Sequence, residues 1–526
     1  MIIDRYTRQV VLPLVTICAS VFLLMLFQRL SSLSVWDDAY MFVRYADNFL
    51  EYGNLSWNPN AESTYGLTSL AYLIVVIPLR LIFSTQPAFV MILSSLISGL
   101  LALLSIIWLL RKLITEHVHR LIIWVVLSLS FVVAGESVTT HLTSGMDTMF
   151  SVFVVTVWLG VLYLSNHYGL MGVISGFFFI VRPDLLIFAI GVIPILIISV
   201  SHSQLEKYFV GMMITLLVQI VIAWLYFGNP LPLSFYAKSM TIYSEQFYQY
   251  YTYTSSSFFL EFILSYTYLT GIIVIGFMAR FKSWQWQDKA ILLGGIGFCV
   301  YHVVFVVPIM GFSQRFFYPL LPILIILAGR GVIHLISLLP VAIVETLKTY
   351  PMRVLFVPLL LIFAFINPMP IILILVQYTQ PDDLPTIGIG RFDLQTTYDY
   401  LYIDNWYGLD ELSKLDDDIV IATTEIGLPG VMNPRKTIID MAGLNHPDFA
   451  LNGFSADWLM VGDHQPDWIY MPFPHYEGMW YAIYDHPVFQ TEYQFFSAQL
   501  LGTSMDVAIR RDSKFYSIMI ELFNKL

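Results

Sequence analysis

Long blocks of apolar residues, separated by short polar stretches, dominate the first 377 residues of this 526-residue chain. The first block runs from Val10 to Leu30 behind two arginines, and it is long enough to cross a bilayer as an uncleaved helix. Later blocks of spanning or near-spanning length are Pro87–Leu110, Leu121–Val133, Met149–Leu164, Leu185–Val200, Tyr208–Phe227, Phe258–Met278, Ala290–Pro308, Phe317–Leu339 and Val354–Val376. The pattern predicts an α-helical polytopic membrane protein.

Two apolar blocks need a different interpretation. Gly169–Val181 gives only roughly 20 Å of helix before Pro183, so it can cross a membrane only together with irregular backbone buried in protein. Counting Leu67–Phe83 as a span would place Arg111 and Lys112 outside, against the positive-inside rule, so we predict a juxtamembrane helix there. The predicted topology has about eleven transmembrane helices, a cytoplasmic N-terminus and an extracytoplasmic C-terminus.

The pattern of apolar and polar residues changes after residue 377. Short β-rich runs alternate with polar turns, and three of them are expected to be buried strands: Asp418–Ala422, Thr437–Asp440 and Asp467–Met471. We therefore predict two domains. Residues 1–377 form a transmembrane domain whose first outer loop is 31–65, and residues 378–526 form a soluble α/β domain outside the membrane.

Composition and charge support this division. Hydrophobic residues make up 57% of the chain and charged residues 12%, which excludes an ordinary soluble globular protein. The net charge of −11 comes from the C-terminal part, which has 22 acidic and 8 basic residues, and such a surface argues against a nucleic-acid partner. The two cysteines, Cys18 and Cys299, lie in apolar blocks, so neither a disulfide framework nor a cysteine-based metal site is expected.

Two adjacent carboxylates, Asp37 and Asp38, follow the first predicted span directly. Near hydrocarbon such a pair is costly unless it forms ion pairs, binds a cation or takes part in acid–base chemistry. Crowding would raise one of the two pKa values toward neutrality, as a general base for a hydroxyl requires. The alternative is a solvated helix cap, with one aspartate as the N-cap residue.

The first loop also carries an ordered set of short motifs. It reads Asp37-Asp38-Ala39-Tyr40, Arg44-Tyr45-Ala46-Asp47-Asn48, Gly53-Asn54-Leu55 and Trp57-Asn58-Pro59. This resembles the first-loop signature of bacterial GT-C membrane glycosyltransferases, most closely the terminal arabinofuranosyltransferases of mycobacterial cell walls. Further matches follow in the same order: Gly145-Met146-Asp147-Thr148, Arg182-Pro183-Asp184, Asn229-Pro230-Leu231-Pro232, Phe235-Tyr236-Ala237-Lys238, Arg315-Phe316-Phe317-Tyr318-Pro319 and Gly443-Leu444-Asn445-His446-Pro447.

The resemblance implies a GT-C fold in the bacterial inner membrane and a polyprenyl-phosphate-linked sugar as donor. The acceptor would be a glycan or glycolipid of the cell envelope, and membrane lipids would surround the enzyme. One carboxylate of Asp37 and Asp38 would act as general base, and the sugar would transfer with inversion. Asp147 stands where the family has glutamate, which leaves the transferred sugar open. No cofactor is predicted, and a divalent cation stays possible.

Candidate substrate-binding residues come from the same motifs, and they are Tyr40, Arg44, Asp147, Arg182, Asp184, Lys238 and Arg315. A phosphate leaving group requires cations, so we assign the lipid phosphate to Lys238 and Arg315. Each could instead be an ordinary basic residue at a helix end, whose side chain extends to the membrane interface. Arg182 and Asp184 could form an internal ion pair, and Asp147 could cap the helix that begins at Thr148.

Three other functions are compatible with parts of the pattern. A lipid or solute transporter would also place charges beside broken helices, although no inverted repeat is visible. A protein O-glycosyltransferase of the same fold would use the same base and lipid donor. An anchored receptor would need only one span. His141 and His302 are expected to be structural, because no His or Cys cluster has metal-ligand spacing.

Overall fold

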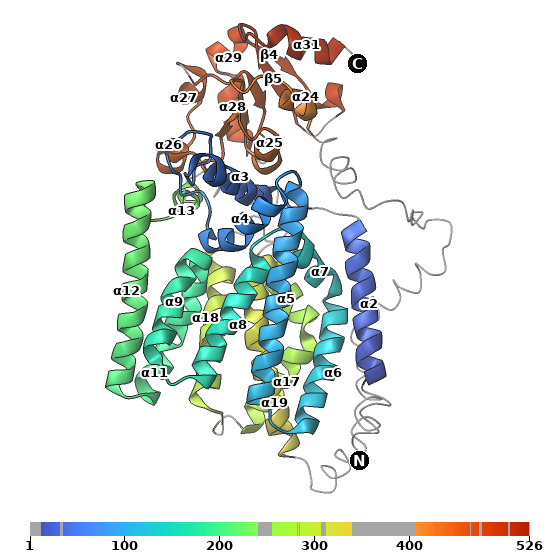
Figure 1. Ribbon diagram of the computed structural model, residues 1–526, viewed down its shortest axis with the longest axis vertical. Coiled ribbons are helices and arrows are strands. Elements are labelled where there is room, and N and C mark those ends of the chain that lie inside the picture. Colours follow the sequence, from blue (N-terminus) through green and yellow to red (C-terminus); the bar gives the residue numbers. More distant parts are fainter. Residues whose placement is uncertain are drawn as a thin grey trace.

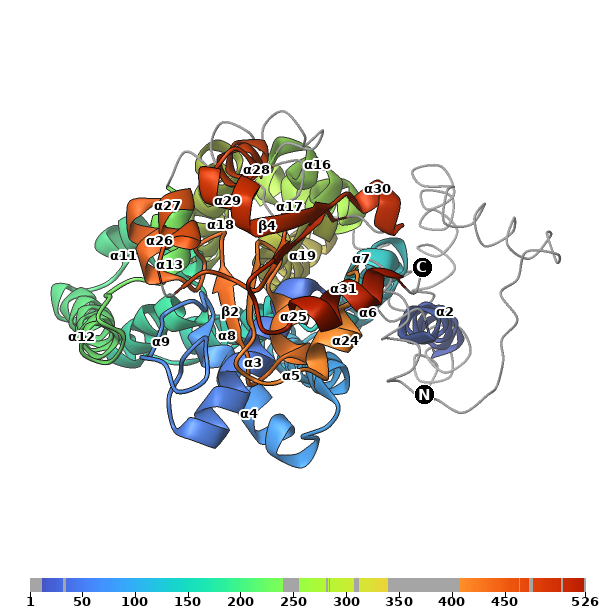
Figure 2. The same ribbon diagram turned by 90° about the horizontal axis from the view of Figure 1, so that it is seen from above.

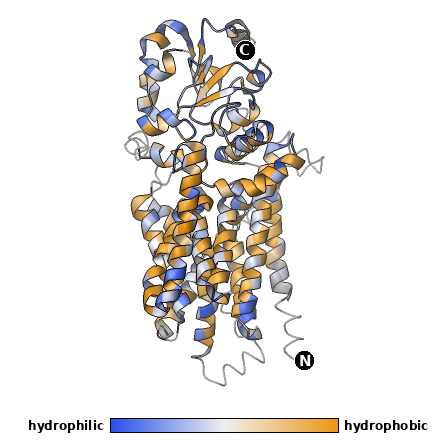
Figure 3. Cartoon of the chain, turned by 60° about the vertical axis from the view of Figure 1, so that its left-hand side comes forward, coloured by the Kyte–Doolittle hydropathy of each residue, from blue (hydrophilic) through white to orange (hydrophobic). Residues whose placement is uncertain are grey.

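The computed structural model describes residues 12–31, 35–239, 255–280, 282, 284–306, 312–338, 406–462, 464–472, 476–502 and 505–524. This part of the chain is mostly helical, and it forms a bundle of apolar helices with a smaller C-terminal body of strands and short helices (Figure 1). The bundle is predominantly hydrophobic, whereas the C-terminal body mixes polar and apolar residues (Figure 3). The predicted boundary at residue 378 lies outside the described residues.

Four described helices are long and apolar enough to cross a membrane. They are α5 (Pro87–Leu113), α12 (His202–Phe227), α18 (Trp286–Phe305) and the continuous pair of η5 (Phe312–Leu320) with α19 (Leu321–Ile336). Two bent pairs raise the number to six: α6 (His117–Val133) with α7 (Gly135–Thr143), and α16 (Ser255–Ser265) with α17 (Thr267–Arg280). The total of eleven spans stays a prediction, and the predicted span at 354–376 lies outside the described residues.

Other apolar helices are shorter or interrupted. They are α2 (Leu12–Ser31), α8 (Thr148–Leu164), α9 (Tyr168–Val181) and the series η3 (Pro183–Leu185), α10 (Leu186–Gly191) and α11 (Ile193–Ser199). The predicted span Leu185–Val200 is thus interrupted at Val192, because Pro194 lacks the N–H that would continue the hydrogen-bond ladder. The predicted span Phe258–Met278 bends by 83° near Tyr266, whose buried ring packs against Tyr318.

The short helix α9 packs closely along α12. A Cβ atom at Gly172 would lie 2.1 Å from the Tyr208 carbonyl oxygen, so only glycine permits this approach of the two backbones. At its C-terminal end α9 stops at Arg182, which has an extended backbone, and η3 follows. The predicted combination of a short helix with irregular backbone is confirmed here. Arg182 therefore lies at the junction between two helices, inside the protein.

A layer of short elements lies between the bundle and the C-terminal body (Figure 1). It consists of α3 (Asp37–Tyr52), η2 (Leu70–Tyr72), α4 (Leu73–Ile82) and α13 (Leu233–Ala237). The block predicted as a juxtamembrane helix is α4 with η2, and it is too short for a span. Seen from above, the C-terminal body covers the centre of the bundle, with α12 and α2 at opposite edges (Figure 2).

The C-terminal body contains a five-stranded sheet with the order β2-β1-β3-β5-β4. The strands are β1 (Val420–Thr423), β2 (Thr437–Asp440), β3 (Trp468–Tyr470), β4 (Tyr493–Phe496) and β5 (Val507–Arg510). The three predicted strands are confirmed as the parallel half, and β4 and β5, which add an antiparallel edge, were not predicted. The helices are α24 (Leu409–Ser413), α25 (Gly427–Met432), α26 (Pro447–Asn452), α27 (Ala456–Met460), α28 (Glu477–Tyr484), α29 (Pro487–Glu492), α30 (Ala498–Leu501) and α31 (Tyr516–Asn524).

Candidate active site

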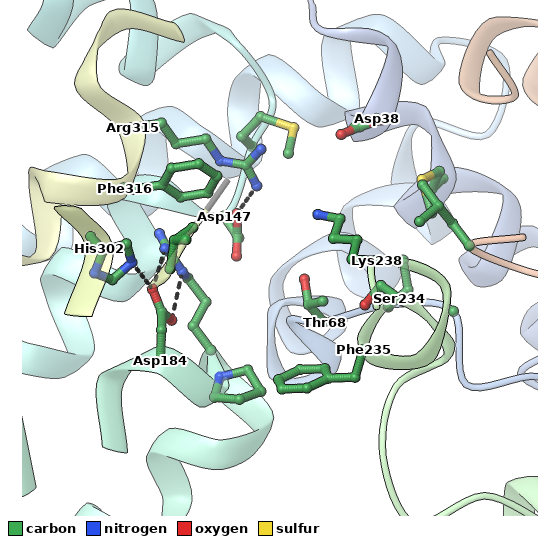
Figure 4. Close-up of a pocket in the computed structure, with 18 of the residues that line it drawn as sticks. Asp38, Thr68, Asp147, Asp184, Ser234, Phe235, Lys238, His302, Arg315 and Phe316 are labelled. Carbon is green, nitrogen blue, oxygen red and sulfur yellow. Dashed lines mark hydrogen bonds and ion pairs between the residues drawn. The ribbon is translucent and has the colours of Figure 1, made fainter. Parts of the chain in front are cut away.

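A cavity of about 370 Å³ lies where the bundle, the intermediate layer and the C-terminal body meet. Its walls come from α3, the segment after the first loop, the start of α8, the α9–η3 junction, α13, the end of α18 and η5. Six of the predicted site residues line it: Asp38, Asp147, Arg182, Asp184, Lys238 and Arg315. The C-terminal body contributes Leu444. Figure 4 shows the acidic and basic side chains converging on this space.

The two adjacent aspartates have different surroundings. Trp36 is the N-cap residue of α3, so neither aspartate occupies the capping position considered from the sequence. The backbone N–H groups of Gly427 and Leu428 donate to Asp37, at 2.8 and 2.7 Å. Burial raises the pKa of Asp37 to about 6, and these N–H donors limit the rise. Asp37 therefore joins α3 to α25, and of the two only Asp38 lines the cavity.

Asp38 faces basic groups across the cavity. Burial raises the pKa of its carboxyl, and the positive charges of Arg315 and Lys238 oppose the rise. In Figure 4 the side chains of Lys238 and Arg315 approach the region of Asp38 from opposite walls. A carboxylate with a raised pKa beside fixed cations is suited to accept a proton.

Arg315 is held by a strained turn and by an ion pair. The residues before it, Ser313 and Gln314, have φ of 53° and 60°, a conformation that persists only where surrounding contacts enforce it. Ser137 Oγ donates to the Ser313 carbonyl oxygen at 2.8 Å and to Gln314 Oε1 at 2.9 Å. Arg315 Nη2 donates to Asp147 Oδ1 at 2.9 Å. Arg315 Nε and Asp147 Oδ2 have no partner among the described residues, and both belong to cavity-lining side chains.

Arg182 and Asp184 form the internal ion pair considered from the sequence. Arg182 Nη2 lies 2.6 Å from Asp184 Oδ2, and His302 Nε2 lies 3.0 Å from the same oxygen. Both residues of the pair also line the cavity, and their contact with a substrate stays a prediction. Asp147 occupies the N-cap position of α8, but its side chain makes no capping hydrogen bond.

The wall opposite Arg315 is formed by α13. The Leu233 N–H donates to the Tyr65 carbonyl oxygen at 2.7 Å, which fixes the helix to the first loop. Leu233 and Ala237 share an apolar cluster with the C-terminal body, so this body also determines where Lys238 lies. Further around the cavity, Phe235 and Phe305 are 43% and 73% exposed, so this side of the cavity has an apolar rim on the surface of the molecule.

The other two predicted site residues, Tyr40 and Arg44, do not line the cavity. Arg44 is 1% exposed, and its guanidinium donates to five oxygens in the first loop and the C-terminal body. These are the carbonyl oxygens of Trp57, Gly430, Asn433 and Lys436 and the side-chain oxygen of Asn58, at 2.6 to 3.0 Å. Tyr40 is also buried, in the apolar core. The assignment of Arg44 to substrate binding is therefore corrected: its hydrogen bonds join the two parts of the molecule.

The cavity also contains residues that the sequence analysis did not assign to the site. Thr68, Ser234, His302 and Phe316 line it, and Ser234 Oγ is buried without a partner among the described residues. Phe316 lies within the motif Arg315–Pro319, and Ser234 lies between two further motifs, Asn229–Pro232 and Phe235–Lys238, so nearness to a motif was a usable signal for both. His302 lies inside an apolar block, where a single polar residue resembles an ordinary core histidine.

Glu425 lies near the two aspartates in the C-terminal body, and burial together with Asp37, Asp38 and Asp440 raises its pKa to about 8. The folded protein thus binds this proton more tightly than the unfolded chain, so the stability contributed below about pH 4.5 is lost as pH rises through about 8. We expect Glu425→Gln to raise the free energy of unfolding at about pH 8.5 by about 1 kcal/mol, measured by thermal unfolding across the pH range. The exposed Glu411→Gln is the control, and an unchanged pH slope in Glu425→Gln would contradict the assignment.

Among the described residues, no group of three or more His, Cys, Asp or Glu side chains is arranged to hold a metal ion. Comparison with protein-family models, curated proteins and solved structures finds no match to this chain.

Proposed function

We propose that this protein is a membrane glycosyltransferase of the GT-C type. It transfers a sugar from a polyprenyl-phosphate donor to a hydroxyl of a cell-envelope glycan or glycolipid. The proposal places the protein in the bacterial inner membrane, with the cavity and the C-terminal body on the extracytoplasmic side. Four to six described helices long enough to cross a membrane support a membrane location.

The observation that carries the proposal is the pairing of Asp38 with a basic wall in one cavity. Asp38, whose pKa is raised, can take a proton, and Arg315 and Lys238 can stabilise an anion on the other side. The exposed rings of Phe235 and Phe305 border the same cavity and offer an apolar surface for an isoprenoid chain. Transfer of a sugar from a lipid-phosphate donor requires three features, which are a base, an anion site and an apolar surface.

The chemistry follows from this arrangement. The acceptor hydroxyl oxygen attacks the anomeric carbon from the face opposite the phosphate, and Asp38 takes the hydroxyl proton. The bond between the anomeric carbon and the phosphate oxygen breaks, and its electron pair leaves with the polyprenyl phosphate. Arg315 and Lys238 stabilise the charge that develops on the phosphate. Attack from the opposite face inverts the anomeric configuration.

We expect Arg315→Lys to raise the KM for the lipid donor about tenfold and to change the KM for the acceptor little. The guanidinium can hold two phosphate oxygens at once, whereas an ammonium offers a single point charge. Steady-state kinetics with farnesyl-phosphate-linked sugars, arabinofuranose among them, measures both constants. Arg80→Lys is the matched control, because Arg80 pairs with Asp47 and does not line the cavity.

Three outcomes would contradict the proposal or part of it. An unchanged donor KM in Arg315→Lys would show that Arg315 does not contact the donor phosphate. Wild-type protein that transfers none of these sugars but moves the intact lipid across a bilayer would favour a transporter. Transfer to a serine or threonine peptide in place of a glycan acceptor would instead indicate a protein O-glycosyltransferase with the same site.

A further inference from the structure

Both ring nitrogens of His302 face groups that only accept hydrogen bonds. Nδ1 lies 3.0 Å from the carbonyl oxygen of Phe298, and Nε2 lies 3.0 Å from Asp184 Oδ2. A backbone carbonyl has no proton to donate, so Nδ1 carries a hydrogen. A neutral imidazole carries its single hydrogen on one nitrogen, so Nε2 would then present a lone pair to the carboxylate.

Asp184 is itself in the ionised form. Arg182 Nε donates to Oδ1 at 3.2 Å and Arg182 Nη2 donates to Oδ2 at 2.6 Å, the two-pronged geometry of a guanidinium with a carboxylate. The positive charge of the guanidinium favours the ionised carboxylate. The contact between His302 Nε2 and Oδ2 is therefore favourable only when the imidazole carries a second proton.

The arrangement fixes the orientation of the Arg182 guanidinium. Asp184 occupies Nε and Nη2, and Nη1 is buried without a partner among the described residues, on a side chain that lines the cavity. The Phe316 ring lies against both partners, with its centroid 5.8 Å from the Arg182 guanidinium carbon and 5.9 Å from the centroid of the His302 ring. In Figure 4 a dashed line joins His302 to Asp184 on the side of the cavity away from Asp38.

The second proton on His302 changes the net charge of the cavity. The lining has three carboxylates, Asp38, Asp147 and Asp184, and three basic side chains, Arg182, Lys238 and Arg315. These six charges cancel, so a charged His302 leaves one positive charge in excess. A phosphodiester, which carries one negative charge, would be neutralised by it.

We propose that His302 is held as an imidazolium and acts as a positioning residue that, through Asp184, directs the free Nη1 of Arg182 to the phosphate of the lipid donor. The inference rests on the proposed function for the identity of the anion, and on hydrogen-bond geometry for the charge. The charged and titratable groups around His302 are Asp184 and Arg182 from the α9–η3 junction, Arg315 from η5 and Tyr301 from its own helix. The neighbouring α10 has no titratable side chain, and α16 carries only the exposed Glu261.

Nuclear magnetic resonance of the full-length protein with ¹⁵N-labelled histidine tests the charge directly. His302→Gln assigns the signal by its disappearance, and the remote His167→Gln is the control. We expect both ring nitrogens of His302 to show the protonated pattern at about pH 7. A pattern with one protonated nitrogen at about pH 7 would overturn the proposal, whatever the protein binds.

Binding of farnesyl phosphate tests the positioning role. We expect His302→Gln to weaken binding about tenfold, and His302→Lys, which keeps a positive charge, to restore part of the affinity. Equal affinity in wild-type protein and His302→Gln would overturn the proposal. If wild-type protein binds no farnesyl phosphate while the histidine signal is doubly protonated, the proposed function fails and the charge assignment stands. If His302→Gln does not fold, Asp184→Asn replaces it, with the same expected loss of affinity.

Discussion

We expect Asp38→Asn to lower sugar transfer by about 10² or more while the protein still folds, because an amide cannot take the acceptor proton. Asparagine matches aspartate in shape, and no hydrogen bond of Asp38 holds the described structure together in the way that those of Asp37 do. The turnover number with farnesyl-phosphate-linked sugars measures the effect. The thermal unfolding midpoint and the affinity for farnesyl phosphate should change little, which separates loss of the base from loss of binding.

Asp37→Asn is the matched control for this experiment. Its side chain would present an amide N–H to one of the two backbone N–H groups of α25, so we expect a lower unfolding midpoint and a smaller loss of turnover. Normal turnover in Asp38→Asn would exclude Asp38 as the base. If Asp37→Asn lost turnover fully and Asp38→Asn did not, the roles of the two aspartates would be reversed.

The second large effect concerns stability. We expect Arg44→Met to lower the free energy of unfolding by about 3 to 5 kcal/mol, because it removes five buried hydrogen bonds of a charged group, each worth about 1 kcal/mol or more. The substitution keeps much of the apolar stem but removes five hydrogen bonds that link α3 to the first loop and to the C-terminal body. Limited proteolysis should then cut the C-terminal body from the rest at lower protease concentration than in wild-type protein.

Arg435→Met is the control for Arg44→Met. Arg435 pairs with Asp417 at the surface, where its side chain is 65% exposed, so we expect a change in stability within about 0.5 kcal/mol. Equal unfolding midpoints and equal protease sensitivity in Arg44→Met and wild-type protein would show that the hydrogen bonds of Arg44 do not hold the two parts together.

Much of the architecture could be predicted from local sequence. Apolar blocks of 20 or more residues predict long helices because only a helix satisfies its backbone groups in an apolar environment, and α5 and α12 follow. The parallel strands β1, β2 and β3 were predicted because their short apolar runs are bounded by polar turns. The strand β4 was missed because Tyr493–Phe496 is only partly buried and has no clear period, and β5 was missed because Val507–Arg510 is a run of only four residues.

The candidate site could be predicted as a set of residues but not as an arrangement. Polar residues at the ends of apolar blocks are costly in any fold, so Asp147, Arg182 and Arg315 were visible without a structure. Their pairing was not, because Asp147 and Arg315 are 168 positions apart and meet only when α8 packs beside η5. The involvement of His302 likewise depends on a contact with Asp184 across 118 positions.

The sequence by itself determined that two carboxylates follow the first apolar helix, but tertiary structure alone decided what each of them does. Successive residues of a helix point about 100° apart, so neighbours in sequence face different surroundings. Asp37 meets the N–H groups of α25, and Asp38 meets the cavity. The same holds for Arg44. Its motif predicted a contact with substrate, but the C-terminal body packs around its guanidinium, and the guanidinium donates to backbone oxygens some 390 positions away in the sequence. Local sequence specifies the helix and the side chain, and long-range packing decides which group that side chain reaches.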